Sequence, residues 1–184
     1  MTLYRCFASN HRARPDEPDG PLWFPRALQG DGRHDNPDLY GCLYASASDV
    51  SAVVEQLARF RSQRLIQSML LRRGLPLAVA HVELDDDAKL VDLDDPAVLV
   101  QRKLRPSRVA TRRRDLTQTQ ARDIYTDRPT AAGLRWWSIH ESTWTNVTLF
   151  DRARPSLKPA TIRMLSFDDA AVIEAAEFLG LRRV

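Results

Sequence analysis

The apolar residues of this chain come in short segments that proline, glycine and charged residues interrupt. The longest apolar segment, residues 75–82, contains Pro76 and His81 and is far shorter than the roughly 20 apolar residues of a membrane-spanning helix. The 184 residues suffice for one domain with a hydrophobic core. The composition, with 43% hydrophobic and 28% charged residues, is typical of a globular protein. We therefore expect a single domain over residues 1–184, with no membrane association.

The N-terminus and the cysteines indicate an intracellular protein. Arg5 interrupts the apolar residues 3–8, where a signal peptide would have its uncharged central region. Cys6 and Cys42 are too few for a disulfide framework and form no CxxC motif. We expect a cytoplasmic location and two buried thiols.

Basic and acidic residues nearly cancel over the whole chain. There are 27 basic and 24 acidic residues, and only three of the basic ones are lysines. Arginine binds phosphate in bidentate fashion, so this composition is compatible with an anionic ligand. The arginines of residues 105–114 resemble a nucleic-acid patch, but the balance of charge over the chain favours a solvated basic turn. We expect no direct contact with nucleic acid.

Short alternating segments and helix-capping residues together predict an α+β fold with mixed or antiparallel sheets and flanking helices. Strands are predicted where apolar or β-branched residues alternate, and helices where an N-cap residue precedes apolar residues of helical spacing. The predicted strands are residues 3–8, 42–46, 75–84, 89–93, 134–139, 144–150 and 161–165. The predicted helices are residues 49–61, 65–73 with a stop at Gly74, 96–101, 115–125, and 170–179 after a capping box at 166–169 and before Gly180.

The common metal and nucleotide motifs are absent from the sequence. The four histidines have none of the spacings of a metal site, so we expect no bound metal. The run Asp85-Asp86-Asp87 lacks the glycine and glutamate of a calcium loop. Gly30-Asp31-Gly32 lacks the third glycine of a Rossmann motif, and no P-loop exists.

Four polar or aromatic residues have simple structural interpretations when each is taken singly. Glu55 and Arg59 stand four positions apart on a predicted helix, which is the spacing of a surface ion pair. Arg33 lies on or beside the sharp turn predicted for residues 29–37 and could tie it together. Tyr44 could be a half-buried strand aromatic, and Ser138 could end a strand.

Taken together, five segments resemble the RES-domain family. They are Gly32-Arg33, Leu43-Tyr44-Ala45-Ser46, Ala52-Val53-Val54-Glu55, Gly133-Leu134-Arg135-Trp136-Trp137-Ser138 and Asn146-Val147-Thr148-Leu149-Phe150. Eleven positions separate Arg33 from Tyr44 and again Tyr44 from Glu55, in the order of the family. Many members have Gly-Arg-Trp-Asn where this chain has Gly32-Arg33-His34-Asp35, so the chain resembles a divergent subgroup.

This resemblance implies a fold similar to that of ADP-ribosyltransferases, which hold NAD⁺ without a Rossmann motif. It also implies a toxin of a toxin–antitoxin pair that cleaves the nicotinamide–ribose bond, with water or inorganic phosphate as acceptor. The alternatives are transfer of ADP-ribose to a protein and, from another class, a noncatalytic module that binds nucleic acid or protein. NAD⁺ is then a substrate, and no resident cofactor is expected.

The resemblance also implies the roles of individual residues. Glu55 would stabilise positive charge on the ribose, Arg33 would bind the diphosphate, and Tyr44 would stack on the nicotinamide ribose. Ser138 would position the ligand or Glu55, and Ser46 would contribute to NAD⁺ binding. The implied protein partner is an antitoxin with a helix-turn-helix region.

Overall fold

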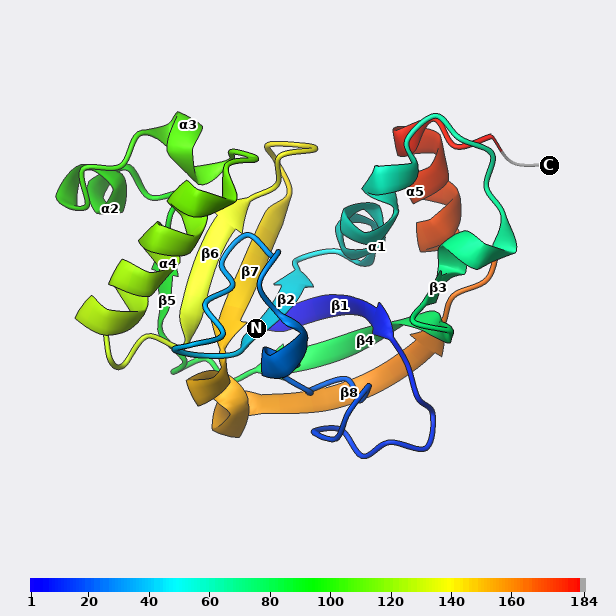
Figure 1. Ribbon diagram of the computed structural model, residues 1–184, viewed down its shortest axis with the longest axis horizontal. Helices are drawn as coiled ribbons and strands as arrows, with labels where there is room; N and C mark the ends of the chain where they lie inside the picture. Colours follow the sequence, from blue (N-terminus) through cyan, green and yellow to red (C-terminus); the bar gives the residue numbers. More distant parts are fainter. Residues whose placement is uncertain (183–184) are drawn as a thin grey trace. The chain divides into compact units, whose positions relative to one another are not determined.

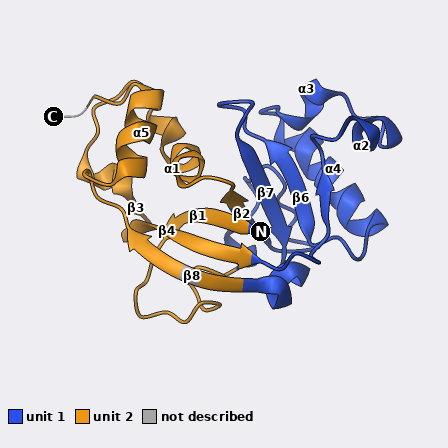
Figure 2. Ribbon diagram, turned by 180° about the vertical axis from the view of Figure 1, so that it is seen from behind, with its two compact units in different colours: residues 1, 24–44, 84–157 blue, residues 2–23, 45–83, 158–184 orange. Residues whose placement is uncertain are grey.

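The computed structural model describes residues 1–182 and has the expected α+β architecture, with a mixed sheet and flanking helices (Figure 1). The chain divides into two compact units, which Figure 2 distinguishes by colour. Unit 1 comprises residues 1, 24–44 and 84–157. Unit 2 comprises residues 2–23, 45–83 and the chain from residue 158 onwards.

Unit 2 is built on an antiparallel sheet with two helices. Along this part of the sheet the strand order is β3-β4-β1-β2, and β8 also pairs with β4. Strands β1 and β4 pair along their length, from Thr2 opposite Glu83 to Ala8 opposite Leu77. The strands are β1 (Thr2–Ala8), β2 (Cys42–Ser46), which begins in unit 1, β3 (Leu71–Arg72), β4 (Leu75–Leu84) and β8 (Leu157–Met164).

Helices α1 (Asp49–Leu57) and α5 (Ala170–Leu179) pack against each other in unit 2. The Ser48 side chain caps α1 by accepting a hydrogen bond from the Ser51 backbone N–H. Apolar residues of both helices are buried where α1 packs against α5 and β1, and such packing stabilises helices as short as these. The short 3₁₀ helices η2 (Ala58–Phe60) and η3 (Gln67–Leu70) follow α1.

Unit 1 carries strands β5, β6 and β7 and three helices. Strand β6 pairs antiparallel with β7 and parallel with β5 at the sheet edge, and β7 neighbours β2. The strands are β5 (Leu90–Asp92), β6 (Gly133–Trp137) and β7 (Thr145–Phe150). The helices are α2 (Pro96–Gln101), α3 (Pro106–Val109) and α4 (Arg114–Asp127), with 3₁₀ helices η1 (Arg26–Leu28) and η4 (Asp151–Ser156).

One hydrophobic core joins the helices and strands of unit 1. Ala121 and Ile124 of α4 face this core, and each of α2, α3, β6 and β7 adds at least one buried side chain. Tyr40, Tyr125 and Phe150 form an aromatic cluster within it, with ring centroids 4.4 to 5.1 Å apart. The core therefore fixes α4 against β6 and β7, and Tyr44 of β2 packs against the same core.

Most of the predicted elements are confirmed. Strands β2 and β4 and helices α2 and α5 have the predicted bounds, and the other predicted strands are present with shifts of a few residues at their ends. The helix predicted for residues 115–125 is α4, and the one predicted for residues 49–61 ends at Leu57 before the 3₁₀ turn η2. Cys6 and Cys42 are free and buried, as expected.

The helix predicted for residues 65–73 is wrong. The structure has the 3₁₀ turn η3 there and then β3, which forms a hairpin with β4. Arg73 and Gly74 both have positive φ, 53° and 78°, as the two central residues of a tight hairpin require. A glycine of positive φ ends helices and also forms hairpin turns, and here pairing with β4 decides between the two.

The predicted capping box before α5 is also corrected. The N-cap is Asp169, whose carboxylate accepts a hydrogen bond from the Ala171 backbone N–H at 3.0 Å. The predicted end of this helix is confirmed, because Gly180 takes the left-handed conformation at its C-cap.

Within the described part of the chain, no helix is both long and apolar enough to span a bilayer.

Gly133 provides a test of the β6–β7 pairing. A Cβ atom at this position would lie 2.2 Å from the Thr148 carbonyl oxygen, which is backbone and cannot move aside cheaply. We expect Gly133→Ala to lower the free energy of unfolding by about 1 to 3 kcal/mol, the usual cost of overpacking. Urea denaturation measures the free energy of unfolding, with Thr161→Ala at an exposed position of β8 as the control. Equal stability of the two variants would contradict the close approach of Gly133 to the Thr148 carbonyl.

Candidate functional site

Residues 30–36, which we call the Arg33 loop, are held together by the carboxylate of Asp35. Its Oδ2 accepts hydrogen bonds from the backbone N–H groups of Gly30 and Gly32 at 2.9 and 2.7 Å. Its Oδ1 accepts a 2.6 Å hydrogen bond from the Tyr44 hydroxyl. A Cβ at Gly32 would lie 2.5 Å from the Asp35 carboxylate, so the loop needs glycine there.

Tyr44 projects from β2 and joins that strand to the Arg33 loop. Its hydroxyl donates to Asp35 and accepts a 2.9 Å hydrogen bond from the His34 backbone N–H. Burial, with the nearby thiol of Cys42 and carboxylate of Asp35, raises the pKa of Tyr44 well above its ordinary value. The hydroxyl therefore stays protonated and donates its proton in the hydrogen bond to Asp35. The ring is then the part of Tyr44 that suits contact with a ligand.

Arg33 is buried, with 5% of its surface exposed, and its guanidinium group is fixed in place. Nη1 donates to the carbonyl oxygens of Val109 at 3.1 Å and Thr111 at 2.5 Å. The guanidinium lies over the Trp136 ring, 4.6 Å from its centroid. These contacts join Arg33 to residues far from its own turn, and they hold a positive charge rigidly beside the Arg33 loop.

Helix α4 also holds the Arg33 loop through hydrogen bonds. The Thr117 hydroxyl donates a 2.5 Å hydrogen bond to the Arg33 carbonyl oxygen. Gln118 Nε2 donates to the carbonyl oxygens of Gly30 and Gly32 at 2.8 and 2.9 Å. The Asn36 amide donates to the Tyr40 hydroxyl at 2.7 Å and to the Gln118 carbonyl oxygen at 3.0 Å. The loop backbone is thus satisfied by side chains of a helix more than 75 residues away in sequence.

His34 fills the space between Tyr44 and Trp136. Its ring stacks on Tyr44 and meets Trp136 edge-on, with centroids 6.5 and 5.3 Å apart. Nδ1 lies 2.8 Å from the Thr148 hydroxyl, which also accepts a 3.1 Å hydrogen bond from Trp136 Nε1. Burial, with the charges of Arg33 and Arg114, lowers the pKa of His34 well below its ordinary value, so the ring is neutral.

Ser138 follows β6 and is buried in unit 1. Its backbone N–H donates to the Trp144 carbonyl oxygen at 2.8 Å, and its hydroxyl accepts a 3.1 Å hydrogen bond from the His140 N–H. It stands two positions after Trp136, on which Arg33 stacks. Ser138 therefore shapes the turn between β6 and β7, and its contact with a ligand stays a prediction.

The two other predicted site residues belong to unit 2. Glu55 lies in the second half of α1 and is half-buried, and Ser46 is buried at the end of β2. The structure thus joins Arg33 and Tyr44 through His34 and Asp35 within unit 1, whereas the participation of Glu55 and Ser46 in one site with them stays a prediction.

The sequence interpretation missed Asp35, Thr117 and Gln118 as supports of the Arg33 loop. A signal existed on α4, because Thr117 and Gln120 share the spacing of the buried Ala121 and Ile124. Polar residues on the inward face of a helix need hydrogen-bond partners, but nothing in the sequence names the loop that provides them.

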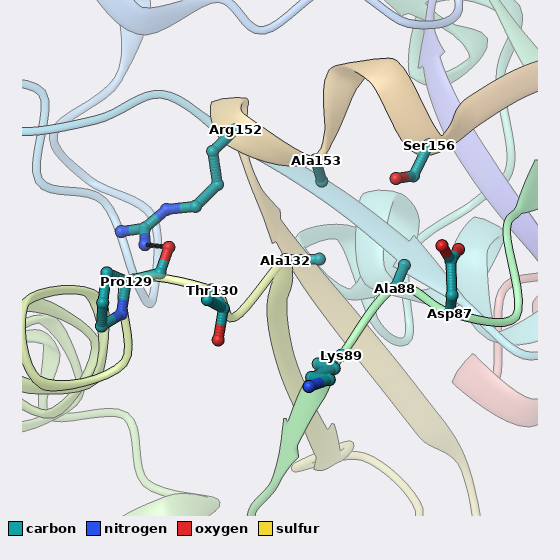
Figure 3. A pocket seen from close by; sticks show the side chains of 9 residues that line it. All are labelled: Asp87, Ala88, Lys89, Pro129, Thr130, Ala132, Arg152, Ala153 and Ser156. Atoms are coloured by element: carbon teal, nitrogen blue, oxygen red, sulfur yellow. Dashed lines mark hydrogen bonds between the residues drawn. The ribbon is translucent and has the colours of Figure 1, made fainter.

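A separate pocket of about 380 Å³ lies in unit 1 and contains none of the predicted site residues (Figure 3). Its wall includes Arg152, which Figure 3 shows directed at Pro129. Arg152 also donates to the carbonyl oxygens of Arg128 and Tyr125 and stacks on the Tyr125 ring. Arg152 thus binds backbone carbonyl groups at the end of α4.

Comparison with known proteins identifies the family. A family model described as the RES domain matches residues 2–169. The chain belongs to the RES domain family. A chain of the M. tuberculosis MbcT–MbcA toxin–antitoxin complex has the same fold, with a TM-score of 0.60 and 16% identity, covering 97% of this chain and 88% of that one. No curated protein matches the sequence.

Among residues 1–182, no three or more His, Cys, Asp or Glu side chains come close enough to hold a metal ion. The expectation that this RES domain has no metal and no resident cofactor stays a prediction.

Neutral His34 makes the stability of the domain depend on pH. The folded protein keeps His34 unprotonated, so only the unfolded chain gains a proton on it as the pH falls below about 6.5. Stability is therefore full above this pH and falls below it, by up to about 1.4 kcal/mol per pH unit from this group. Denaturation between pH 5 and 7.5 should show a smaller dependence of stability on pH for His34→Gln than for the wild type; the same dependence in both would contradict this prediction.

Proposed function

We propose that the chain is the toxin of a toxin–antitoxin pair and that it cleaves the nicotinamide–ribose bond of NAD⁺. The observation that carries this proposal is the Arg33 loop: the family motif at Gly32-Arg33 is held rigidly beside Tyr44 by the Asp35 carboxylate. The match to the RES domain over residues 2–169 supports the enzyme class. The fold of the toxin–antitoxin complex supports the biological role.

The reaction requires few groups. The bond between the ribose carbon and the nicotinamide nitrogen breaks, and both electrons leave with the neutral nicotinamide. The ribose then carries positive charge until water or phosphate attacks it. An enzyme accelerates this step with a carboxylate near the ribose, a cation for the diphosphate and a surface for the planar base.

We assign these roles to Glu55, Arg33 and Tyr44. The Glu55 carboxylate stabilises the developing charge on the ribose. The Arg33 guanidinium supplies the cation, and its stacking on Trp136 and bonds to two carbonyl oxygens limit the entropy lost when it binds an anion. The Tyr44 ring provides the flat surface, because its hydroxyl is committed to Asp35. Ser46 and Ser138 contribute hydroxyl groups that orient the ligand.

Glu55→Gln tests the catalytic assignment. Removal of the carboxylate charge should reduce NAD⁺ cleavage by roughly 10² to 10⁴-fold, the range for loss of a charge-stabilising group. Chromatography with mass detection measures NAD⁺ loss and free nicotinamide, and thermal unfolding checks the fold. The matched control is Glu174→Gln at an exposed position of α5, which should cleave NAD⁺ at the wild-type rate.

The same assay identifies the acceptor. NAD⁺ cleavage that depends on added phosphate indicates phosphorolysis. Cleavage that does not depend on phosphate and releases free ADP-ribose indicates hydrolysis. ADP-ribose attached to a protein would support the transferase alternative. No consumption of NAD⁺ under any of these conditions would contradict the enzyme proposal and favour the noncatalytic module.

Arg33 has two roles that separate variants can distinguish. Arg33→Lys removes the planar guanidinium, and we expect the KM for NAD⁺ to rise about 10- to 100-fold, the value of a charge-assisted hydrogen bond. Thr117→Val removes the hydrogen bond between α4 and the Arg33 carbonyl and leaves the guanidinium in place. If both variants change KM equally, Arg33 only supports the loop.

We also propose that the inhibitory partner is an antitoxin with a helix-turn-helix region. The support is the toxin–antitoxin complex of similar fold together with the family of this chain. Loss of NAD⁺ cleavage on addition of the candidate antitoxin, measured in the same assay, tests this partner.

A further inference from the structure

Residues 102–114, which we call the basic segment, concentrate positive charge in one part of unit 1. They hold seven of the 27 basic residues and none of the 24 acidic ones, so the rest of the chain has 20 basic and 24 acidic residues. We expected no contact with nucleic acid because the charges of the whole chain nearly cancel. That balance does not reveal that the positive charge is concentrated in the basic segment. The basic segment runs from the end of α2 through α3 to the start of α4 (Figure 1).

Most of the cations in the basic segment have no internal partner. Arg113 pairs with Asp115 at 2.7 Å, and Arg102 lies 3.8 Å from Asp127. The other five side chains are exposed and make no hydrogen bond or ion pair with any residue that the structure describes. They are Lys103, Arg105, Arg108, Arg112 and Arg114.

The backbone beneath these cations is fixed. Val109 is buried in the core of unit 1, and Arg33 binds the carbonyl oxygens of Val109 and Thr111. Gln120 of α4 donates to the Arg108 carbonyl oxygen at 3.2 Å. A preformed array of cations loses little backbone entropy when it binds, which favours an interaction surface over a mobile solvated turn.

The turn after α2 provides an independent indication. Lys103 has φ of 54°, in the left-handed conformation that favours glycine. The hydrogen bonds from Lys103 N–H to the Val100 carbonyl and from Leu104 N–H to the Leu99 carbonyl form the usual C-terminal helix motif. A lysine at this glycine position adds a charge to the basic segment at a conformational cost.

The chemistry of the basic segment distinguishes between kinds of anionic partner. None of its residues is an exposed large hydrophobic residue, whereas the centre of a protein–protein interface needs apolar or aromatic anchors. It also has no aromatic residue on which the bases of a single strand would stack. Six arginines and one lysine suit phosphate groups, and strongly positive polar surfaces are typical of contacts with a nucleic-acid backbone.

We propose that the basic segment binds the phosphate backbone of double-stranded nucleic acid without reading its sequence. Each of the five unpaired cations contacts a phosphate and releases a condensed counterion. The turn after α2 holds Lys103 and Arg105, α3 carries Arg108, and Arg112 and Arg114 stand before and at the start of α4. This proposal does not rest on NAD⁺ cleavage and can be tested with protein that has no substrate bound.

Fluorescence anisotropy with a labelled 24-base-pair DNA duplex, at several NaCl concentrations from 50 to 300 mM, tests the proposal. We expect Kd values of about 10⁻⁶ to 10⁻⁴ M near physiological salt and a slope of log affinity against log salt of about −4.5, from five phosphate contacts. The same measurement with an RNA duplex of equal length shows whether the basic segment prefers the DNA or the RNA backbone. Absence of binding to both duplexes at 50 mM salt would overturn the proposal.

The variant R105Q/R108Q/R112Q removes three of the cations. It should weaken duplex binding at 50 mM salt at least about tenfold and reduce the size of the slope by about 3. The matched control R12Q/R59Q/R64Q removes the same charge from exposed positions of unit 2 and should retain the wild-type slope. If both triple variants weaken duplex binding equally, the binding depends only on net charge, and the proposal of a site in the basic segment is wrong.

Two further measurements keep the proposal falsifiable. Circular dichroism shows whether the triple variant folds. If it does not, the single variant Arg108→Glu, which reverses one exposed charge, replaces it. Unchanged affinity of Arg108→Glu for the duplex would contradict the proposal. Single-stranded DNA and poly-glutamate are compared as ligands at the same salt. Tighter binding of either one than of the duplex would assign the basic segment to another partner.

Discussion

The arrangement of the candidate site depends on one buried carboxylate, that of Asp35. It accepts hydrogen bonds from Gly30, Gly32 and Tyr44, so a carboxylate with only 5% of its residue surface exposed is satisfied without a cationic partner among residues 1–182. Charge-assisted hydrogen bonds of this kind are stronger than neutral ones, and leaving such a group unpaired is costly. The loop conformation, the orientation of Tyr44 and the need for glycine at position 32 follow from this one group.

The second buried charge, Arg33, is stabilised in a complementary way. Carbonyl oxygens of residues 109 and 111 accept its N–H groups, and the Trp136 ring covers its flat face. His34, between Tyr44 and Trp136, stays neutral because burial and the neighbouring cations oppose its protonation. Unit 1 therefore holds one fixed anion, one fixed cation and one neutral imidazole within three consecutive residues, and the proposed NAD⁺ chemistry uses the cation.

The contacts of Arg33 connect the Arg33 loop with the basic segment. The carbonyl groups that accept hydrogen bonds from Arg33 belong to the backbone that presents Arg108 and Arg112 to solvent. His34 and Asp35, where the chain departs from the common family motif, also make defined contacts here. Histidine fills the aromatic space beside Trp136, and aspartate provides the two acceptor atoms that the loop and Tyr44 need.

The sequence by itself determined the elements whose signals are local. Strand Cys42–Ser46 and helix Ala170–Leu179 have the predicted bounds, because alternation, an acidic N-cap and a C-terminal glycine act within a few residues. The sequence also placed Arg33 and Tyr44 as candidates through spacing that resembles a family. Tertiary structure decided the rest: pairing with β4 made a hairpin of a predicted helix, and α4 supplied the hydrogen-bond partners of a loop more than 75 residues away. Such partners lie beyond the reach of sequence patterns, because a buried polar group specifies that it needs a hydrogen bond but not which distant residue provides it.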